Sequence, residues 1–444
     1  MKSFYALIFC LSIIIIEPWG LSRGEIWTQP KVLIVLLITL FNLCILWDEK
    51  SALTIPRSWK ISAVLWLLFL ATGIISTLNS PFPTISLFGQ DQMGDGLLYW
   101  LLIATFTLSN TLLLKQHPEI FPAQIRGLLI GGIILCLSIF PQVINWHIDY
   151  TATMGELLKE NILVSSIFRD HQPIGLYSHR GHAAFVLIFI GILVLLNRKC
   201  GWLSFPISTV ILIPIVTALL LSNTRMAIIA GLISIIYLQG RKYQKLLICI
   251  TLVGLLVVGL TTTTRKIPGL SPLKQMTSDR IFLWQIASRG IRQRPLFGWG
   301  FDGFGIAYPY SKNKSQKHKQ NVIRLEDFSY DILGKDGQIK TKLLPTYKAH
   351  NLILDTTLSV GILGMLFYTA LWGFYFYLAL QTSVRKIEVL ALAYLSFTFT
   401  WFECAQFTHL VWWMFSVAGS LKFYRNVSIL GFNSNVMKKN PTDE

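Results

Sequence analysis

The sequence predicts an all-α integral membrane protein with about twelve transmembrane helices, both termini in the cytoplasm and one large outer loop between helices nine and ten. Of its 444 residues, 53% are hydrophobic and 14% are charged, whereas a soluble domain usually carries about 25% charged residues. A soluble core could not hide this much apolar surface, so the bilayer is the expected solvent. The net charge of +17 does not indicate nucleic acid as a partner, because the basic residues are scattered between apolar runs.

The individual helices are predicted from apolar runs. A helix needs roughly 20 residues to cross the hydrocarbon core, and fewer when its ends are interfacial. Twelve runs are candidates: 4–19, 31–47, 61–78, 96–114, 125–144, 181–197, 203–221, 226–239, 246–261, 354–380, 388–403 and 408–422. The first is expected to be a retained span, because no small-x-small cleavage site follows it.

The orientation follows from Lys and Arg in the short loops, which favour the cytoplasmic side. With the N-terminus inside, every inner loop holds at least two basic residues, whereas the outer loops 79–95 and 404–407 hold none. We therefore expect spans one to nine over 1–260, an outer loop over 261–350, spans ten to twelve over 351–424 and a cytoplasmic tail over 425–444. The outer loop carries sixteen of the 39 Lys and Arg, and a basic surface beside lipid headgroups attracts anions such as phosphates.

The first candidate site residue is Arg225, in the sequence Ser222-Asn223-Thr224-Arg225 between two apolar runs with almost no loop. Arg225 is thus expected at the outer interface of the bilayer, where short loops disfavour Arg. It either caps a helical hairpin by snorkelling or presents its guanidinium to a phosphate, whose oxygens the planar fork binds bidentately.

The second candidate segment, residues 279–292, reads as an amphipathic helix lying in the interface plane, with Trp284, Ala287 and Ile291 on one stripe. A Gly- and aromatic-rich run over 294–304 follows and predicts a tight turn. Arg280, at the helix start, is the main candidate for phosphate binding, with Arg289 as a further one. Plain membrane anchoring is the alternative for each.

The third candidate is His350, which ends the outer loop in Ala349-His350-Asn351 and opens the tenth span. It should lie at the mouth of any outer cavity, where a neutral imidazole can accept a hydroxyl proton near pH 7. A structural role at a helix start is the alternative. Arg180 and His182, at the outer end of the sixth span, either extend this site or snorkel to the interface.

A metal site is a further alternative in the Gly-rich stretch 89–96. Asp91 and Asp95 are spaced four apart there. Turn chemistry is the plainer interpretation of this stretch, and we expect no metal.

Together these motifs resemble the O-antigen ligase and polymerase superfamily. The resemblance rests on the Asn-Thr-Arg hairpin at 223–225, the Arg-x-x-x-Trp helix leading into Arg-Pro-Leu-Phe-Gly-Trp-Gly at 294–300, and Ala-His-Asn at 349–351 before Gly361-x-x-Gly364. It covers roughly residues 200–380 well and the remainder only by topology. The stretch 177–182 departs from the Gly- and Asn-rich turn that family members often have, which leaves the acceptor open.

The resemblance implies a metal-independent, inverting glycosyltransferase of the bacterial inner membrane that needs no cofactor. It would move a glycan from undecaprenyl pyrophosphate to an acceptor hydroxyl at the periplasmic face, with membrane lipid as a further partner. By motif match, Arg225 and Arg280 would hold the pyrophosphate, and His350 would position or deprotonate the acceptor hydroxyl. Preorganised Arg groups can stabilise the charge that grows on the leaving pyrophosphate.

The sequence leaves several functions open. Within the superfamily the acceptor can be lipid A–core (an O-antigen ligase), a growing glycan (a polymerase) or a protein hydroxyl (a protein O-oligosaccharyltransferase). From another class, a flippase or transporter for a lipid-linked saccharide would also show outer basic residues. However, it needs a cationic path open to both sides, and twelve-span transporters often carry an internal repeat that is absent here. A membrane scaffold would tolerate substitution of all three candidates.

Overall fold

The computed structural model describes residues 1–144, 157–158, 162–163, 173–201, 203–240, 280–312, 321–334, 336–382, 384 and 386–421. Its long helices are α1 (Lys2–Ile14), α2 (Gln29–Asp48), α3 (Arg57–Leu78), α5 (Leu97–Gln116), α6 (Phe121–Val143), α7 (Arg180–Lys199), α8 (Phe205–Leu221), α9 (Arg225–Gln239), α12 (Arg280–Gln293), α14 (Leu352–Gln381), α15 (Glu388–Thr398) and α16 (Thr408–Leu421). Shorter elements are η1 (Gly24–Thr28), α4 (Pro83–Phe88), α13 (Gly303–Ser311), β1 (Leu157–Leu158), β2 (Ile162–Leu163), β3 (Val322–Leu325), β4 (Ser329–Leu333) and β5 (Ile339–Leu343), with single 3-10 turns at Lys50–Ala52 and Pro118–Ile120.

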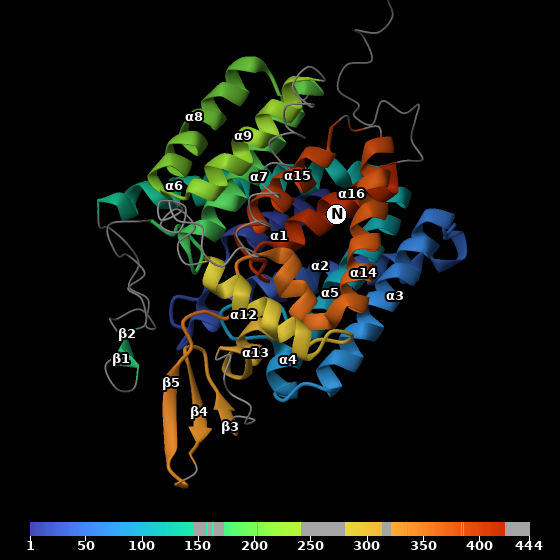
Figure 1. Ribbon diagram of the computed structural model, residues 1–444. Helices are drawn as coiled ribbons and strands as arrows, with labels where there is room; N and C mark the ends of the chain where they lie inside the picture. The colour runs from blue at the N-terminus through green and yellow to red at the C-terminus, as the bar shows by residue number, and fades with distance from the viewer. Residues whose placement is uncertain are drawn as a thin grey trace, which may run out of the picture.

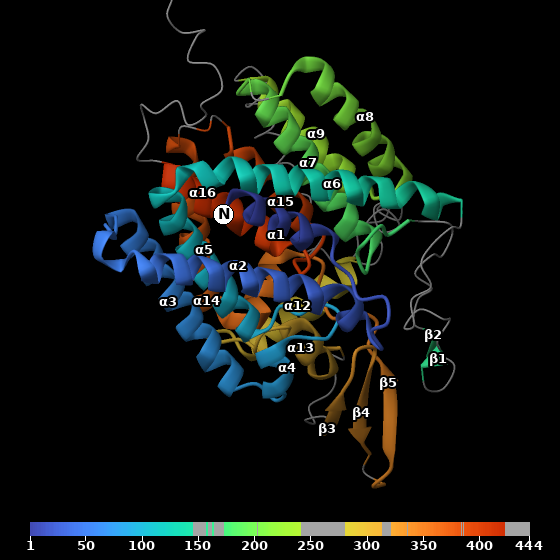
Figure 2. The same cartoon turned by 180° about the vertical axis from the view of Figure 1, so that it is seen from behind.

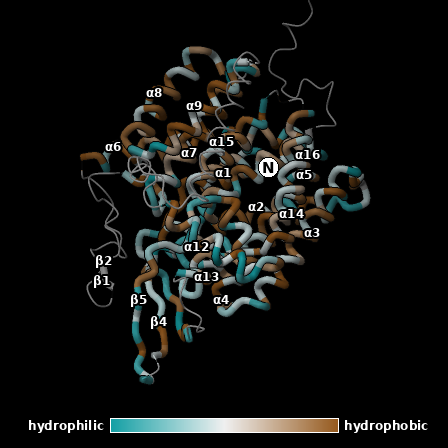
Figure 3. Tube along the Cα trace, viewed as in Figure 1, coloured by the Kyte–Doolittle hydropathy of each residue, from teal (hydrophilic) through white to brown (hydrophobic). Residues whose placement is uncertain are grey.

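The helices form one body, and the sheet of β3, β4 and β5 projects from the end of it that also holds α4, α12 and α13 (Figure 1). Seen from behind, α6, α1 and α2 run across the body, with α1 lying along α6 (Figure 2). Hydrophobic residues dominate α8, α9 and α3, whereas hydrophilic ones gather around α12, α13 and the sheet (Figure 3). This polarity gives the body one distinctly polar end.

The predicted spans correspond closely to helices. Among the described residues, each predicted run contains a helix, but α1 ends at Ile14 within the run 4–19 and α15 ends at Thr398 within the run 388–403. The ninth run, 246–261, lies outside the described residues, as do loop residues 261–279 and the tail 425–444. Within the described ranges, six helical stretches are long and apolar enough to cross a membrane: Gly24–Asp48, Arg57–Leu78, Leu97–Gln116, Pro118–Val143, Arg180–Lys199 and Leu352–Gln381. The multi-pass membrane class is thus supported, while the count of twelve and the orientation stay predictions.

The core of the helical body is aromatic. The Trp66 ring lies tilted against Trp412, with 4.5 Å between ring centroids, and Trp100 and Tyr368 pack around the same pair. All four are nearly inaccessible. Offset and edge-on aromatic pairs contribute beyond their buried area, so this cluster fixes α3, α5, α14 and α16 against one another.

The segment predicted to be the outer loop contains a three-stranded antiparallel sheet in the order β3-β4-β5, which the helical prediction did not include. Leu333 pairs with Ile339 across the β4–β5 turn, and Ser329 pairs with Leu343. The turn contains Gly337 at φ 74°, a conformation that favours glycine. Runs of β-branched residues on both sides of a Gly turn are the usual hairpin signal, but here only Ile332 in β4 and Ile339 and Thr341 in β5 are β-branched, so the signal is weak.

The long helix α14 is interrupted, and the interruption positions the polar end of the body. Gly361 adopts φ 72° and ψ −178° inside it, which frees backbone groups on either side. The Gly- and aromatic-rich turn supplies hydrogen-bond partners for these groups: Trp299 N–H donates to Leu358 O at 2.7 Å, and Ile362 N–H donates to Pro295 O at 2.8 Å. The turn predicted at 294–304 is therefore tied to the helix that His350 precedes.

Candidate functional site

The predicted site residues His350 and Arg280 face one tryptophan ring. The His350 ring packs edge-on against Trp401, with 5.2 Å between centroids, and the Arg280 guanidinium carbon lies 5.7 Å from the centroid of the same ring. His179 contacts Trp401 as well, at 5.1 Å. Phe402 stacks on Trp401 and packs against His350 at 4.9 Å. We call His179, Arg280, His350, Trp401 and Phe402 the Trp401 cluster.

Four separate segments meet at this cluster. His179 immediately precedes α7, Arg280 opens α12, His350 precedes α14, and Trp401 lies in the connection between α15 and α16. Two of these segments are hydrogen-bonded to each other at Asn351, whose side-chain N–H donates to Phe399 O at 3.0 Å. The loop that holds His350 is thereby attached to the loop that holds Trp401.

The electrostatics of the cluster keep its imidazoles neutral. Burial, together with the positive charge of Arg280 and the neighbouring His179, lowers the pKa of His350 to about 3. Burial, with the charges of Arg180 and Arg23, lowers the pKa of His179 to about 4. Burial also lowers the pKa of Arg280, although a guanidinium stays charged at neutral pH. At pH 7 the cluster therefore presents one cation beside neutral imidazoles.

The backbone around His350 is held in a costly conformation. His350 has φ 57°, a left-handed value that costs a non-glycine residue on the order of 1–3 kcal/mol. The Asp355 carboxylate fixes both sides of this turn, accepting the Ala349 N–H at 2.7 Å and the Asn351 N–H at 3.4 Å. Asn351 caps α14, because its side-chain oxygen accepts the Leu354 N–H at 3.1 Å.

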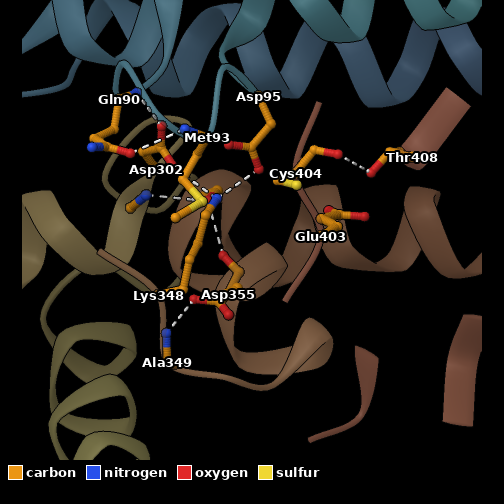
Figure 4. A network of polar contacts seen from close by, with 12 residues as sticks. Gln90, Met93, Asp95, Asp302, Lys348, Ala349, Asp355, Glu403, Cys404 and Thr408 are labelled. Atoms are coloured by element: carbon orange, nitrogen blue, oxygen red, sulfur yellow. Dashed lines mark hydrogen bonds and ion pairs between the residues drawn. The ribbon is translucent and has the colours of Figure 1, made fainter. Parts of the chain in front are cut away.

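A buried ion triad lies two residues before His350. The Lys348 Nζ is 2.6 Å from Asp95 Oδ2 and 2.6 Å from Asp302 Oδ1, and all three side chains are nearly inaccessible (Figure 4). Burial alone would lower the pKa of Lys348, but Asp302 and Asp95 raise it well above its ordinary value. The triad joins the stretch 89–96, the Gly- and aromatic-rich turn and the segment before α14.

The triad borders a small pocket that Asp355 and Glu403 also line, together with Phe69, Trp100 and Phe301. Glu403 accepts hydrogen bonds from the hydroxyls of Tyr368 and Tyr394, at 3.2 and 2.9 Å. The acidic groups of the pocket are thus engaged by a lysine, backbone N–H groups and tyrosine hydroxyls. Asp355 connects this pocket to the His350 turn, because its carboxyl group accepts the N–H groups on both sides of His350.

The three secondary candidates, Arg180, His182 and Arg289, lie in three different environments. His182 is fully buried in the first turn of α7, 3.4 Å from Ser178 Oγ and 3.8 Å from Cys404 Sγ. Arg180 is partly buried beside His179. Arg289 donates to Gln285 O of its own helix at 3.2 Å, which leaves it apart from the cluster.

Among the described residues, no contact links Arg225 to His350. It opens α9 with an exposed side chain, and no hydrogen bond or ion pair joins it to a residue within the described ranges. Tyr237, at the far end of α9, donates to Glu388 at the start of α15. Because α9 packs against α15 in this antiparallel sense, Arg225 lies toward the end of α15 that leads to Trp401.

The possible metal pair of the sequence has other partners. Asp91 Oδ2 accepts the Gly24 N–H at 2.8 Å, and Asp95 belongs to the Lys348 triad. Gly89 and Gly94 take positive φ values of 86° and 65°, as expected of a glycine turn. The turn interpretation therefore describes this stretch.

Sequence reasoning missed Trp401, Lys348 and Asp302. Trp401 lies within the predicted span 388–403, and aromatic residues are common at membrane interfaces. Lys348 was one of many loop lysines, and only its position two residues before His350 set it apart. A charged residue that directly flanks a candidate catalytic residue would have been the available signal.

Residues 183–369 match the family model described as O-antigen ligase, and no curated protein matches the chain. The matched stretch begins within α7 and ends within α14, so it contains Arg225, Arg280 and His350. Trp401 lies beyond it. The resemblance to the O-antigen ligase and polymerase superfamily is confirmed over this stretch.

Proposed function

Because residues 183–369 match the O-antigen ligase family model, we propose that the chain transfers a glycan from undecaprenyl pyrophosphate to an acceptor hydroxyl at the periplasmic face of the bacterial inner membrane. The observation that carries this proposal is the shared contact of Arg280 and His350 with Trp401. A fixed cation beside a neutral imidazole supplies an anion-binding group next to a proton acceptor.

The reaction assigns one task to each group. The acceptor oxygen forms a bond to the anomeric carbon as the bond from that carbon to the pyrophosphate oxygen breaks, which inverts the configuration. The electron pair of the broken bond goes to the pyrophosphate, where Arg280 stabilises the growing charge. The hydroxyl proton goes to His350. We propose Arg225 as a second pyrophosphate ligand, consistent with its place toward the same end of the bundle.

The low pKa of His350 has a consequence for the order of binding. An imidazole of pKa about 3 is unprotonated at pH 7 but accepts a proton weakly, and a general base works best when its pKa is near the working pH. An anionic pyrophosphate at Arg280 would offset the positive charge that lowers this pKa. We therefore expect the donor to bind first and to raise the basicity of His350.

The proposal is tested with purified protein and an undecaprenyl pyrophosphate-linked glycan. H350A and R280A should each lose transfer by about 100-fold or more, because one loses the proton acceptor and the other a transition-state charge contact. The matched controls are H117A, whose histidine pairs with Glu49 elsewhere, and R292A, an exposed arginine on the same helix as Arg280. Full transfer by H350A would refute the proposal.

The same assay separates the alternative functions. Lipid A–core, a glycan repeat and a protein hydroxyl are offered in turn, with a chelator present throughout to test metal independence. Donor movement across vesicles is measured in parallel. If H350A stopped donor movement while wild-type protein transferred no glycan to any acceptor, the lipid-linked saccharide transporter would replace the transferase.

A further inference from the structure

Trp401 has an unused polar atom. Its indole Nε1 is buried and has no hydrogen-bond partner in the described part of the chain. The same holds for Nδ1 of His350, whose ring packs against the indole. A buried donor without a partner is costly. Within the described residues, Trp66, Trp284, Trp372 and Trp412 also bury an unpartnered Nε1, but Trp401 differs from them in contacting Arg280 and His350. Two such atoms on adjacent rings indicate a place where a ligand supplies the missing partners.

The chemistry of the two atoms defines that ligand. An indole N–H can only donate, whereas an imidazole nitrogen can accept when it carries no proton. A hydroxyl group satisfies both, since it accepts one hydrogen bond and donates another. A phosphate oxygen satisfies the donor alone.

The Trp401 ring has a second role. Arg280, His350 and His179 come from different segments, and the ring is what all three contact. A guanidinium within about 6 Å of a tryptophan face gains a cation–π attraction, which limits the rotamers of Arg280. The ring is itself held by Gly181, where a methyl group in place of the hydrogen would lie 2.8 Å from Trp401 Cζ2.

We infer that Trp401 is a substrate-binding residue of this site. Its N–H donates to a glycan hydroxyl, and its ring fixes the positions of the Arg280 and His350 side chains relative to each other. The inference rests on the proposed glycan transfer and names a recognition element within it. Because Trp401 lies outside residues 183–369, the match to the ligase family does not supply it.

Two substitutions at Trp401 separate its roles. W401F keeps an aromatic ring and removes the N–H, so kcat/KM should fall roughly 5- to 10-fold, the equivalent of one neutral hydrogen bond. W401L removes the ring as well and should cost at least roughly a further tenfold, with a raised KM for the lipid-linked donor. An unchanged kcat/KM in W401F would contradict the proposed hydrogen bond from the indole N–H to the glycan. An equal loss of kcat/KM in W401F and W401L would contradict the proposed role of the ring.

A glycine pair provides a test that leaves Trp401 intact. G181A should displace the indole and lower kcat/KM, because its new Cβ would lie within 3 Å of two indole carbons. G373A makes the same change within a helix where nothing lies within 4 Å of the new atom, so its activity should stay at the wild-type level. Equal activity in G181A and G373A would count against the inference.

The outcomes also separate this inference from the proposed function. Glycan transfer by H350A at the wild-type rate would defeat the transferase mechanism itself. Loss of transfer in H350A together with wild-type kinetics in W401F, W401L and G181A would defeat only the role of Trp401. Elution of each variant from gel filtration as wild-type protein excludes misfolding as the cause of a loss.

Discussion

Replacing Lys348 with methionine should destabilise the protein by about 3–5 kcal/mol, the usual cost of removing one partner of a buried ion pair. The Lys348 Nζ lies 2.6 Å from a carboxylate oxygen of Asp95 and of Asp302, and none of the three side chains is more than 6% exposed. Methionine nearly fills the volume, so the cavity contribution is small. The loss arises because the Asp95 and Asp302 carboxyl groups would stay buried without their cation, and it is measured as a lowered unfolding midpoint of the detergent-solubilised protein.

The matched control is the same substitution at Lys340. Lys340 pairs with Asp336 at 3.1 Å, but the two side chains are 58% and 48% exposed. Exposed ion pairs contribute about 0–1 kcal/mol to stability. K340M should leave the midpoint nearly unchanged. If K348M and K340M lowered the midpoint by the same amount, burial of the triad would not be the source of its stability.

Further predictions concern the segments around the site. G361A should prevent folding, because its new Cβ would lie 2.1 Å from Leu296 O. G337A has a similar φ of 74° but open space around the new Cβ, so it should fold at a cost on the order of 1–3 kcal/mol. The yield of monodisperse protein distinguishes the two variants. N351A should cost about 0.5–2 kcal/mol as a lost helix cap, and N351D, which keeps the accepting oxygen, should recover part of the lost unfolding midpoint. Because folded His350 has a pKa of about 3 against about 6.5 unfolded, the unfolded chain binds more protons between these values, so stability should fall as the pH is lowered through this window. H350N should flatten the pH dependence of the unfolding midpoint, and an unchanged slope would contradict the burial argument.

The membrane helices could be predicted because the bilayer imposes one simple rule. A spanning segment must satisfy its own backbone, so apolar length alone identifies it. Each predicted run accordingly contains a helix wherever the chain is described, and α12 begins close to the predicted start of the amphipathic helix. The sheet at 322–343 escaped prediction because its alternating pattern is weak and it lies in a polar loop.

The site was predictable only where a residue had unusual chemistry for its position. His350 and Arg280 stood out at the outer ends of predicted elements, and the structure brings them to one ring. Trp401 and Lys348 did not stand out, because a tryptophan near an interface and a lysine in a basic loop are both ordinary. Their importance arises from contacts between segments far apart in the chain, such as Lys348 with Asp95, and no local pattern contains that information.

The break at Gly361 limits how the loop and the membrane helix can change independently. Carbonyl and N–H groups freed inside a membrane helix need partners from protein, and here the segment from Pro295 to Gly300 supplies them. A loop transplanted from a relative without its own stretch of α14 would leave those groups without partners. The turn and the interrupted helix therefore have to be exchanged as one unit, and loop-swap chimeras meant to alter acceptor choice should place their junctions outside residues 294–364.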